Sequence, residues 1–212
     1  MAPILELAAE QGLRVIEDCA QAHGARIDGR PVGSFGDLAA FSFCQDKIIS
    51  TGGEGGMLLT SSEALWQKAW AFKDHGRRYP SPEQRGLAPG SFRWVHDSFG
   101  SNLRMTEMQA AIGRVQLRKL EEWVQRRRDN AATLVRRLAD IPALSIPQPP
   151  SGVDHAYYKF YVFLDPSRLR PGWSRGRIIG EINERGVPCS TGSYGEIYTE
   201  QAFRQAGFGP PE

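Results

Sequence analysis

The sequence has little of what would place it in a membrane or on nucleic acid. No apolar run among its 212 residues is long enough to cross a bilayer, and the N-terminus lacks the basic stretch and apolar core of a signal peptide. The formal net charge is only +2, which argues against a nucleic-acid binder driven by a basic field. The basic run 126–128 has acidic neighbours and is expected to be a solvated helix face.

Cysteines are also few, and two common nucleotide-binding motifs are missing. Cys19, Cys44 and Cys189 are odd in number and no two are spaced like zinc ligands, so we expect a reduced, cytoplasmic protein without a metal site. The glycine cluster at 52–56 is not followed by Gly-Lys-Ser/Thr and lacks the G-x-G-x-x-G spacing before a helix. A P-loop and a dinucleotide fingerprint are therefore excluded.

What the sequence does contain is the pattern of an α/β protein. Short apolar runs alternate with stretches of helical periodicity, and residues 77–101 between them carry several Pro and Gly and no clear period. The pattern predicts helices at 4–11 and 63–72, strands at 13–16, 38–43 and 56–60, and a long helical stretch at 105–138.

A cluster of four prolines between 142 and 150 then marks a boundary. Beyond it the sequence predicts a smaller α/β unit, with a strand at 157–164, a helix at 175–185 closed by Gly186, and a strand at 187–190. We place the division between the two parts at residue 120, so that 121–212 comprise a connecting helix and the second unit.

Two side chains stand where α/β sheets bind ligands. Asp18 lies at the carboxyl end of one predicted strand and Lys47 lies just past the end of another. Neighbouring strand ends face one crevice, so a catalytic pair is one interpretation. A plain salt bridge or two exposed side chains are equally compatible with this spacing.

A longer series of motifs narrows the choice. The chain contains, in order, Glu-Asp-x-Ala-Gln at 17–21, Gly-x-x-Gly-Asp at 33–37, Phe-Ser-Phe at 41–43, Lys47, and Gly-Glu-Gly-Gly at 53–56. Further matches follow at 73–76, 100–111 and 155–158. Together they resemble the DegT/DnrJ/EryC1/StrS family, whose members are pyridoxal 5′-phosphate (PLP)-dependent aminotransferases of nucleotide-linked keto sugars. The resemblance implies part of a fold type I large domain, with a mostly parallel sheet, in residues 1–120 and an incomplete small domain in 121–212.

The resemblance also implies roles for five residues near the strand ends. Lys47 matches the lysine that forms the Schiff base with PLP, and Asp18 matches the carboxylate that pairs with the pyridine nitrogen. Ala20 resembles the small residue against one ring face, although plain core packing is an alternative for it. Gln21 resembles the contact to the 3-hydroxyl oxygen, with a turn-stabilising amide as its alternative. Ser42 resembles a phosphate ligand.

Residues further along the chain receive weaker assignments. Asn102 resembles an asparagine that reaches the cofactor phosphate of a neighbouring subunit, which would make the protein a homodimer with shared active sites. His75 and Arg104 are weaker candidates for the site. His75 is at least as compatible with a structural role in its loop, and Arg104 with a cap at the start of the helix. Tyr194 lies near where the family's sugar would bind, and we assign it no role.

The reaction implied by the resemblance is a transamination. An amino donor, expected to be glutamate, loads the cofactor, and the amino group then passes to a keto carbon of a nucleotide-linked sugar while Lys47 shuttles the proton. Sugar dehydratases in the same family carry histidine in place of the lysine, so Lys47 argues against that activity. A third hypothesis is a non-catalytic fragment or pseudo-enzyme that acts only as an interaction domain.

The family pattern further includes a substantial segment before the helix at 4–11 and a longer C-terminal end. We therefore expect this chain to be a fragment or a truncated gene product. Such a chain would expose an unpaired sheet edge and an apolar face and would hold phosphate with fewer donors. Low stability and low PLP affinity are the corresponding expectations.

Overall fold

A computed structural model describes residues 1–79, 90, 96–192 and 197–205. The chain forms two compact units, one made of Met1–Leu134 with Pro149–Phe160 and the other of Val135–Gln148 with Tyr161–Glu212. This division differs from the one that we expected at residue 120. The helix that begins there buries Val124 and Ala131 within the first unit, so its first part groups with the preceding residues. Assignment of the two units to the large and small domains of an aminotransferase stays a prediction.

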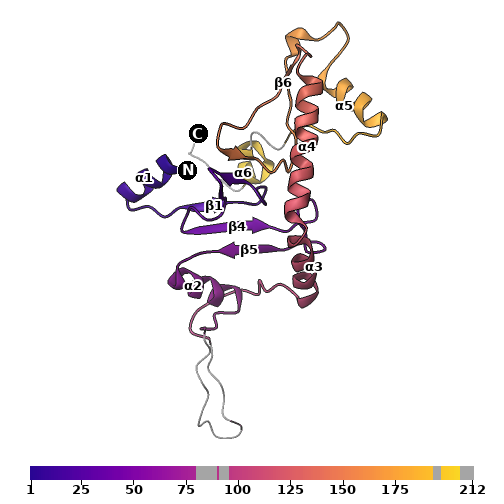
Figure 1. Ribbon diagram of the computed structural model, residues 1–212. Helices are drawn as coiled ribbons and strands as arrows, with labels where there is room; N and C mark the ends of the chain where they lie inside the picture. The colour runs from indigo at the N-terminus through magenta and orange to yellow at the C-terminus, as the bar shows by residue number, and fades with distance from the viewer. Residues whose placement is uncertain (80–89, 91–95, 193–196, 206–212) are drawn as a thin grey trace. The chain divides into compact units, whose positions relative to one another are not determined.

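The first unit is built on a three-stranded mixed sheet with the order β1-β4-β5 (Figure 1). β1 (Ile16–Asp18) runs parallel to β4 (Leu38–Ser42), and β4 runs antiparallel to β5 (Gly56–Leu59). The predicted α/β class is therefore confirmed, as are the strands at 38–43 and 56–60 within a residue or two. The expectation of a mostly parallel sheet is not met in the described residues, because one of the two strand pairs is antiparallel.

The first strand lies later in the sequence than predicted. Residues 13–16 were the expected strand, but β1 contains the two acids Glu17 and Asp18 themselves. Leu13, at the start of the apolar run, lies outside the sheet and is 61% exposed. The carbonyl oxygen of Val15 instead accepts from the backbone N–H of Asp37, which connects the entrance of β1 to the turn before β4.

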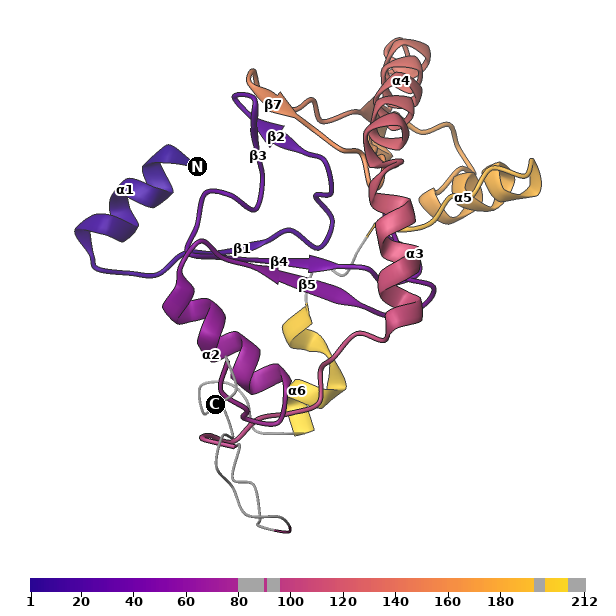
Figure 2. The ribbon, with the colours of Figure 1, turned by 60° about the horizontal axis from the view of Figure 1, so that its bottom comes forward.

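A second, small antiparallel sheet in the same unit was not predicted. Its strands are β2 (Arg26–Ile27), β3 (Arg30–Pro31) and β7 (Val153–Asp154), in the order β3-β2-β7 (Figure 2). Each strand has only two residues, which leaves no alternation to recognise. The pairing of β2 with β7 returns the segment Pro149–Phe160 to the first unit.

Two of the helices in the first unit begin at a side-chain cap. α1 (Ala2–Glu10) precedes β1, and α2 (Glu63–Lys73) follows β5 with Ser62 as its N-cap. The stretch predicted as helical at 105–138 forms two helices, α3 (Glu107–Leu117) and α4 (Leu120–Leu138). Thr106 and Gln109 form a capping box at the start of α3, in which each side chain bonds the other residue's backbone N–H.

The second unit contains a two-stranded sheet and short helices. Its elements are β6 (Leu144–Ser145), β8 (Phe163–Leu164), the 3₁₀ helix η1 (Pro166–Arg168), α5 (Arg175–Glu184), the 3₁₀ helix η2 (Ile197–Thr199) and α6 (Gln201–Gln205). The helix predicted at 175–185 is confirmed, and Gly186 after it has a φ of 77°. That left-handed conformation suits glycine at a helix end.

Two strands predicted around this unit were wrong. Only Phe163–Leu164 of the expected strand 157–164 is extended in a sheet, because Tyr157 has a φ of 48° and both Ala156 and Tyr158 are buried in the core of the first unit. Residues 187–190 form no strand, because the side chain of Asn183 bonds both the N–H and the carbonyl oxygen of Cys189, at 3.0 and 2.7 Å.

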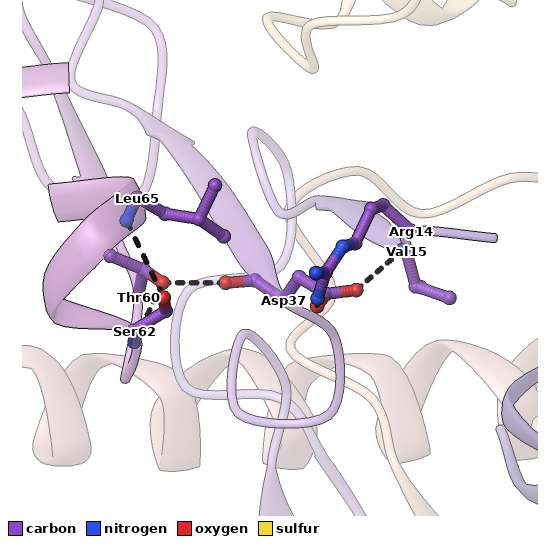
Figure 3. A network of polar contacts seen from close by, with 6 residues as sticks. All are labelled: Arg14, Val15, Asp37, Thr60, Ser62 and Leu65. Atoms are coloured by element: carbon purple, nitrogen blue, oxygen red, sulfur yellow. Dashed lines mark hydrogen bonds and ion pairs between the residues drawn. The ribbon is translucent and has the colours of Figure 1, made fainter. Parts of the chain in front are cut away.

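A polar network around Asp37 holds the ends of the three main strands together (Figure 3). The Asp37 carboxylate accepts from Arg14 Nη1 at 2.6 Å and from the N–H of Val15 at 2.8 Å, before β1 begins. The Asp37 carbonyl oxygen accepts from Thr60 Oγ1 at 2.6 Å, just after β5 ends. Thr60 Oγ1 in turn accepts from the N–H of Ser62, the cap of α2. The aspartate of the Gly-x-x-Gly-Asp motif is thus a structural residue.

The glutamate of the Glu-Asp pair also has a structural role. Glu17 Oε2 accepts from the N–H of Gly33 at 2.7 Å, and Oε1 accepts from the N–H groups of Phe35 and Gly36 at 2.6 and 2.8 Å. Glycine is required at position 36, because a Cβ there would lie 2.6 Å from the carbonyl oxygen of Val15. Glu17 therefore fixes the turn that leads into β4.

Apolar side chains on the two outer strands remain uncovered in the described part of the chain. Ile16 of β1 is 65% exposed, and Met57, Leu58 and Leu59 of β5 are 44–48% exposed. The sheet thus has an apolar surface that no described residue buries.

No helix in the described ranges combines the length and the apolar character that spanning a bilayer requires.

Replacing Glu17 with Gln is expected to lower the free energy of unfolding by about 1–3 kcal/mol, because an amide replaces a carboxylate that satisfies three backbone donors. Urea denaturation followed by circular dichroism measures the change. Glu10→Gln, at an exposed position on α1, is the matched control. Equal stability of the two variants would contradict a structural role for Glu17.

Candidate functional site

The candidate site lies at the carboxyl ends of the parallel strands β1 and β4. Asp18 ends β1 and pairs in register with Ala40, while Ser42 ends β4 two residues further along. The N–H of Cys19 donates to the carbonyl oxygen of Ala40 at 2.8 Å and so continues the pairing past Asp18. The two predicted ligands therefore share one edge of the sheet, where open α/β sheets bind ligands.

Lys47 is positioned by the loop that follows β4. Its N–H donates to the carbonyl oxygen of Cys44 at 3.0 Å, and the next two residues, Ile48 and Ile49, are 5% and 4% exposed. Burial of this apolar pair fixes the backbone from which the lysine side chain extends. The side chain of Lys47 is itself only 14% exposed.

Two neighbours contact the amine of Lys47. Nζ lies 3.3 Å from Asp46 Oδ1 and donates to the Tyr158 hydroxyl at 3.4 Å, and it also lies 4.9 Å from the centroid of the Tyr158 ring. The Tyr158 hydroxyl donates in turn to Asp46 Oδ2. Tyr158 is 9% exposed and belongs to the core cluster that also contains Ile48 and Val124.

These contacts determine the direction in which the pKa values of Lys47 and Asp46 shift. Burial lowers the pKa of Lys47, but the hydrogen bonds to Tyr158 and Asp46 and their charges outweigh it, so the net pKa is raised. The hydrogen bond from Tyr158, followed by that from Cys44, lowers the pKa of Asp46 below its usual range. Asp46 is therefore an anion and Lys47 a cation in this arrangement at neutral pH.

The glycine-rich turn folds back against the end of β4. The N–H of Phe43 donates to the carbonyl oxygen of Gly55 at 2.8 Å, and the buried Thr51 donates through Oγ1 to the carbonyl oxygen of Glu54 at 3.1 Å. A Cβ at position 55 would lie 2.2 Å from Thr51 Oγ1, so only glycine fits there. The turn thus closes the loop that carries Lys47.

His23 is a buried titratable residue beside this loop. It is 2% exposed and its ring lies 5.5 and 5.9 Å from the ring centroids of Phe41 and Phe43. Neither ring nitrogen makes a hydrogen bond of normal geometry to a described residue. Burial lowers the pKa of His23, the backbone of Ser42 opposes this shift, and the charge of Lys47 adds to it.

The other predicted ligands have groups available for a bound molecule. Asp18 is exposed and accepts through Oδ1 from the N–H of Ala20 at 3.0 Å. Ser42 is half-buried, and its oxygen accepts from the N–H of Cys44 at 3.4 Å while its hydroxyl hydrogen has no acceptor in the described residues. Gln21 is exposed and has no hydrogen bond within them.

Asn102 belongs to a separate cluster after α2. Its Oδ1 accepts from Arg104 Nε at 2.9 Å, and its backbone pairs with that of Asp74. Arg104 also lies 3.3 Å from Asp74 Oδ1 and donates to His75 Nε2 at 3.1 Å. Arg104 therefore contacts both His75 and Asn102, and no described contact joins these three candidates to Lys47. Tyr194 lies outside the described residues.

Sequence reasoning missed three residues around Lys47. Asp46 precedes the lysine directly, Tyr158 falls in the last matching motif, and His23 follows the Glu-Asp-x-Ala-Gln segment by two positions. The only indication of their importance in the sequence was that each lies within or close to one of the matching motifs. Their role depends on contacts between segments that are up to 112 residues apart in the sequence.

The donor set fits PLP, the cofactor expected from the sequence. A half-buried amine, an exposed carboxylate and a serine hydroxyl with a free hydrogen lie on or just after the carboxyl ends of the two parallel strands. PLP has an aldehyde, a pyridine nitrogen and a phosphate, which require these three kinds of group. In the described residues, no three His, Cys, Asp or Glu side chains come together as metal ligands would.

Comparison with known proteins agrees with the family resemblance of the motifs. A sequence model described as the DegT/DnrJ/EryC1/StrS aminotransferase family matches residues 1–211. The dTDP-3-amino-3,4,6-trideoxy-alpha-D-glucose transaminase of Streptomyces venezuelae is 31% identical over all 212 residues, which cover 50% of that protein. A GDP-perosamine synthase of Escherichia coli O157:H7 is 42% identical over 131 residues, which are 62% of this chain and 33% of that protein.

Solved structures agree with the sequence relatives. The aminotransferase from Psychrobacter cryohalolentis is 50% identical with a TM-score of 0.89, over 99% of this chain and 55% of that one. The Streptomyces venezuelae DesV structure, solved in complex with a ketimine intermediate, is 31% identical with a TM-score of 0.80, over 99% of this chain and 50% of that one. This chain spans about half the length of the curated relatives that it matches.

Burial of His23 predicts a pH dependence of stability. The unfolded imidazole, with a pKa of about 6.5, takes up a proton as the pH falls, whereas the buried ring resists protonation because its pKa is lowered. Stability is thus full above pH 7 and decreases below about 6.5, by at most about 1.4 kcal/mol per pH unit for this one group. His155, whose pKa burial also lowers, contributes in the same direction.

Urea unfolding between pH 7 and 5.5 measures this effect. His23→Leu is expected to remove part of the dependence, while His96→Gln at an exposed position should leave it unchanged. A slope that is identical in the His23 variant and the parent would contradict the expectation.

Proposed function

The chain belongs to the DegT/DnrJ/EryC1/StrS aminotransferase family, and we propose that the protein that carries it transfers an amino group to a nucleotide-linked keto sugar. The observation that carries the proposal is Lys47, a half-buried amine held just beyond the carboxyl end of β4. Relatives named for UDP-, dTDP- and GDP-linked sugars support a sugar substrate that is linked to a nucleotide.

The cofactor of this family is PLP. When bound, PLP would supply an aldehyde carbon that carries the amino group from donor to acceptor and a ring that acts as an electron sink. In our proposal Lys47 binds the cofactor covalently, and Asp18 keeps the proton on the pyridine nitrogen. The hydroxyl of Ser42 donates to the phosphate, Ala20 packs against one ring face, and Gln21 bonds the 3-hydroxyl oxygen.

Lys47 has a second task after it releases the cofactor. Transamination requires a proton to leave one carbon of the reacting pair and to return to another, and a flexible primary amine can reach both. The low exposure of Lys47 restricts water from competing for this proton. Overall, glutamate and the keto sugar give 2-oxoglutarate and the amino sugar, with glutamate proposed as the donor.

The cluster of His75, Asn102 and Arg104 supports a shared site in a homodimer. Asn102 is exposed and no described contact joins it to Lys47, so it is accessible to a neighbouring copy. We propose that its amide reaches the phosphate of the partner's cofactor, while Arg104 and Asp74 hold it in place.

An assay with a 4-keto nucleotide sugar, glutamate and PLP tests the proposal through the formation of 2-oxoglutarate and amino sugar. Lys47→Ala is expected to lower the rate by at least about 1,000-fold, since it removes both covalent binding and proton transfer. Lys68→Ala, at an exposed position on α2, is the control. Absence of transamination with 3-keto and 4-keto sugars would favour the alternative, a non-catalytic interaction domain.

A further inference from the structure

Lys47, Asp46 and Tyr158 form a closed ring of polar contacts. The Asp46 carboxylate reaches Lys47 Nζ through Oδ1 at 3.3 Å and the Tyr158 hydroxyl through Oδ2. The third side of the ring is the 3.4 Å contact between Nζ and the Tyr158 oxygen. Three side chains from two segments 112 residues apart thus meet at the amine.

The groups around the amine favour its charged, ammonium form. Tyr158 has one hydroxyl hydrogen, and it points to Asp46, so the tyrosine oxygen can only accept from Nζ. Asp46 as a carboxylate also accepts only. Both partners therefore accept from Nζ, and it is the negative charge of Asp46 at 3.3 Å, together with the Tyr158 ring 4.9 Å away, that favours the ammonium over the neutral amine.

The remaining neighbours strengthen this preference. The Cys44 thiol donates to Asp46 Oδ1 at 3.2 Å, which stabilises the carboxylate as an anion. Burial lowers the pKa of His23, so this ring does not add a second positive charge beside Lys47. Arg127 Nη1 donates to the backbone carbonyl oxygens of Tyr157 and Tyr158 at 3.3 Å and holds that segment in place.

We propose that Asp46 and Tyr158 form a holding site for Lys47, that is, a pair of contacts that binds its ammonium form. The site keeps the amine protonated until the lysine leaves these two residues to bind the cofactor. In this role Tyr158 is a positioning residue that acts partly through Asp46. The proposal concerns a state of the chain without cofactor, and it rests on the proposed function only in that Lys47 is the lysine that PLP uses.

The holding site has a chemical consequence. An ammonium has no lone pair, so it cannot attack an aldehyde until it loses a proton. Attachment of the cofactor then requires the lysine to leave Asp46 and Tyr158 and to give that proton to solvent. Removal of the Asp46 carboxylate or the Tyr158 hydroxyl should therefore make Lys47 more reactive at neutral pH, even though Lys47 loses a contact that holds its side chain.

Competitive labelling of the cofactor-free protein with acetic anhydride tests this, with the acetylation of each lysine followed by mass spectrometry as a function of pH. The pH midpoint of labelling reports the protonation of Nζ rather than its accessibility. In the parent protein, the midpoint of Lys47 should lie above that of the exposed Lys68 in the same molecule. A midpoint at or below that of Lys68 would overturn the proposal.

Two variants test the two partners separately. Asp46→Asn should move the Lys47 midpoint to lower pH and raise its labelling rate at pH 8 by ~3-fold or more, since a tenfold change in the free amine corresponds to one pH unit. Tyr158→Phe keeps the buried ring and should move the midpoint in the same direction by less. Tyr157→Phe, one residue away and without a described contact to Lys47, should leave it unchanged.

Unchanged midpoints in both folded variants would overturn the holding site, and if either variant fails to fold, the other and the parent profile decide. Because the measurement uses no PLP and no sugar, its outcome is independent of the transamination assay. A failure of the assay with shifted midpoints would reject the proposed function alone.

Discussion

The parallel pairing of β1 with β4 is the constraint on which the candidate site depends. It brings Asp18 to the same sheet edge as Ser42 and the loop that carries Lys47, although 29 positions separate the aspartate from the lysine. A slip by one residue would turn every side chain of β1 to the other face. Glu17 and Asp37 oppose such a slip, because each bonds backbone N–H groups of segments next to these strands.

This arrangement explains why several motif residues have no direct part in the proposed chemistry. Glu17 fixes the turn before β4, Asp37 connects the ends of the strands, and Gly55 allows the loop after β4 to close. A reactive lysine needs such support because its position depends on backbone that leaves the sheet. The series of motifs at 17–56 therefore contains residues that support the loop and the strands as well as the candidate ligands of the cofactor.

The surroundings of Lys47 add a condition that a covalent role alone does not require. The lysine is only slightly exposed, yet its neighbours favour a charged amine over a neutral one. Burial by itself would have the opposite effect. Asp46 and Tyr158 outweigh that effect through their contacts, so in our account the chain stores Lys47 in a form that is not yet nucleophilic.

Much of the frame could be predicted from the sequence, because local patterns determine it. The strands β4 and β5 and the helices α2 and α5 have clear periodicity and recognisable ends. The small sheet of β2, β3 and β7 could not be found, since two-residue strands carry no period. The strand predicted at 157–164 was wrong, because Tyr158 packs in the core of the first unit and this segment does not alternate between two faces of a sheet.

The candidate site divides in the same way. Asp18, Ser42 and Lys47 could be proposed from motifs because their positions relative to strand ends are local facts. The contact of Tyr158 with Asp46 and Lys47 spans more than 110 residues and depends on the return of the chain through β7. Only the folded chain reveals that neighbour, and with it the preferred charge of the lysine.

The central claim is that Lys47 is the residue that PLP uses, and one measurement addresses it directly. The protein is incubated with PLP and reduced with borohydride, which fixes the cofactor on its lysine, and the modified peptide is then identified by mass spectrometry. The account predicts one dominant phosphopyridoxyl group, on Lys47. A dominant group on another lysine, such as Lys73 or Lys159, would contradict it.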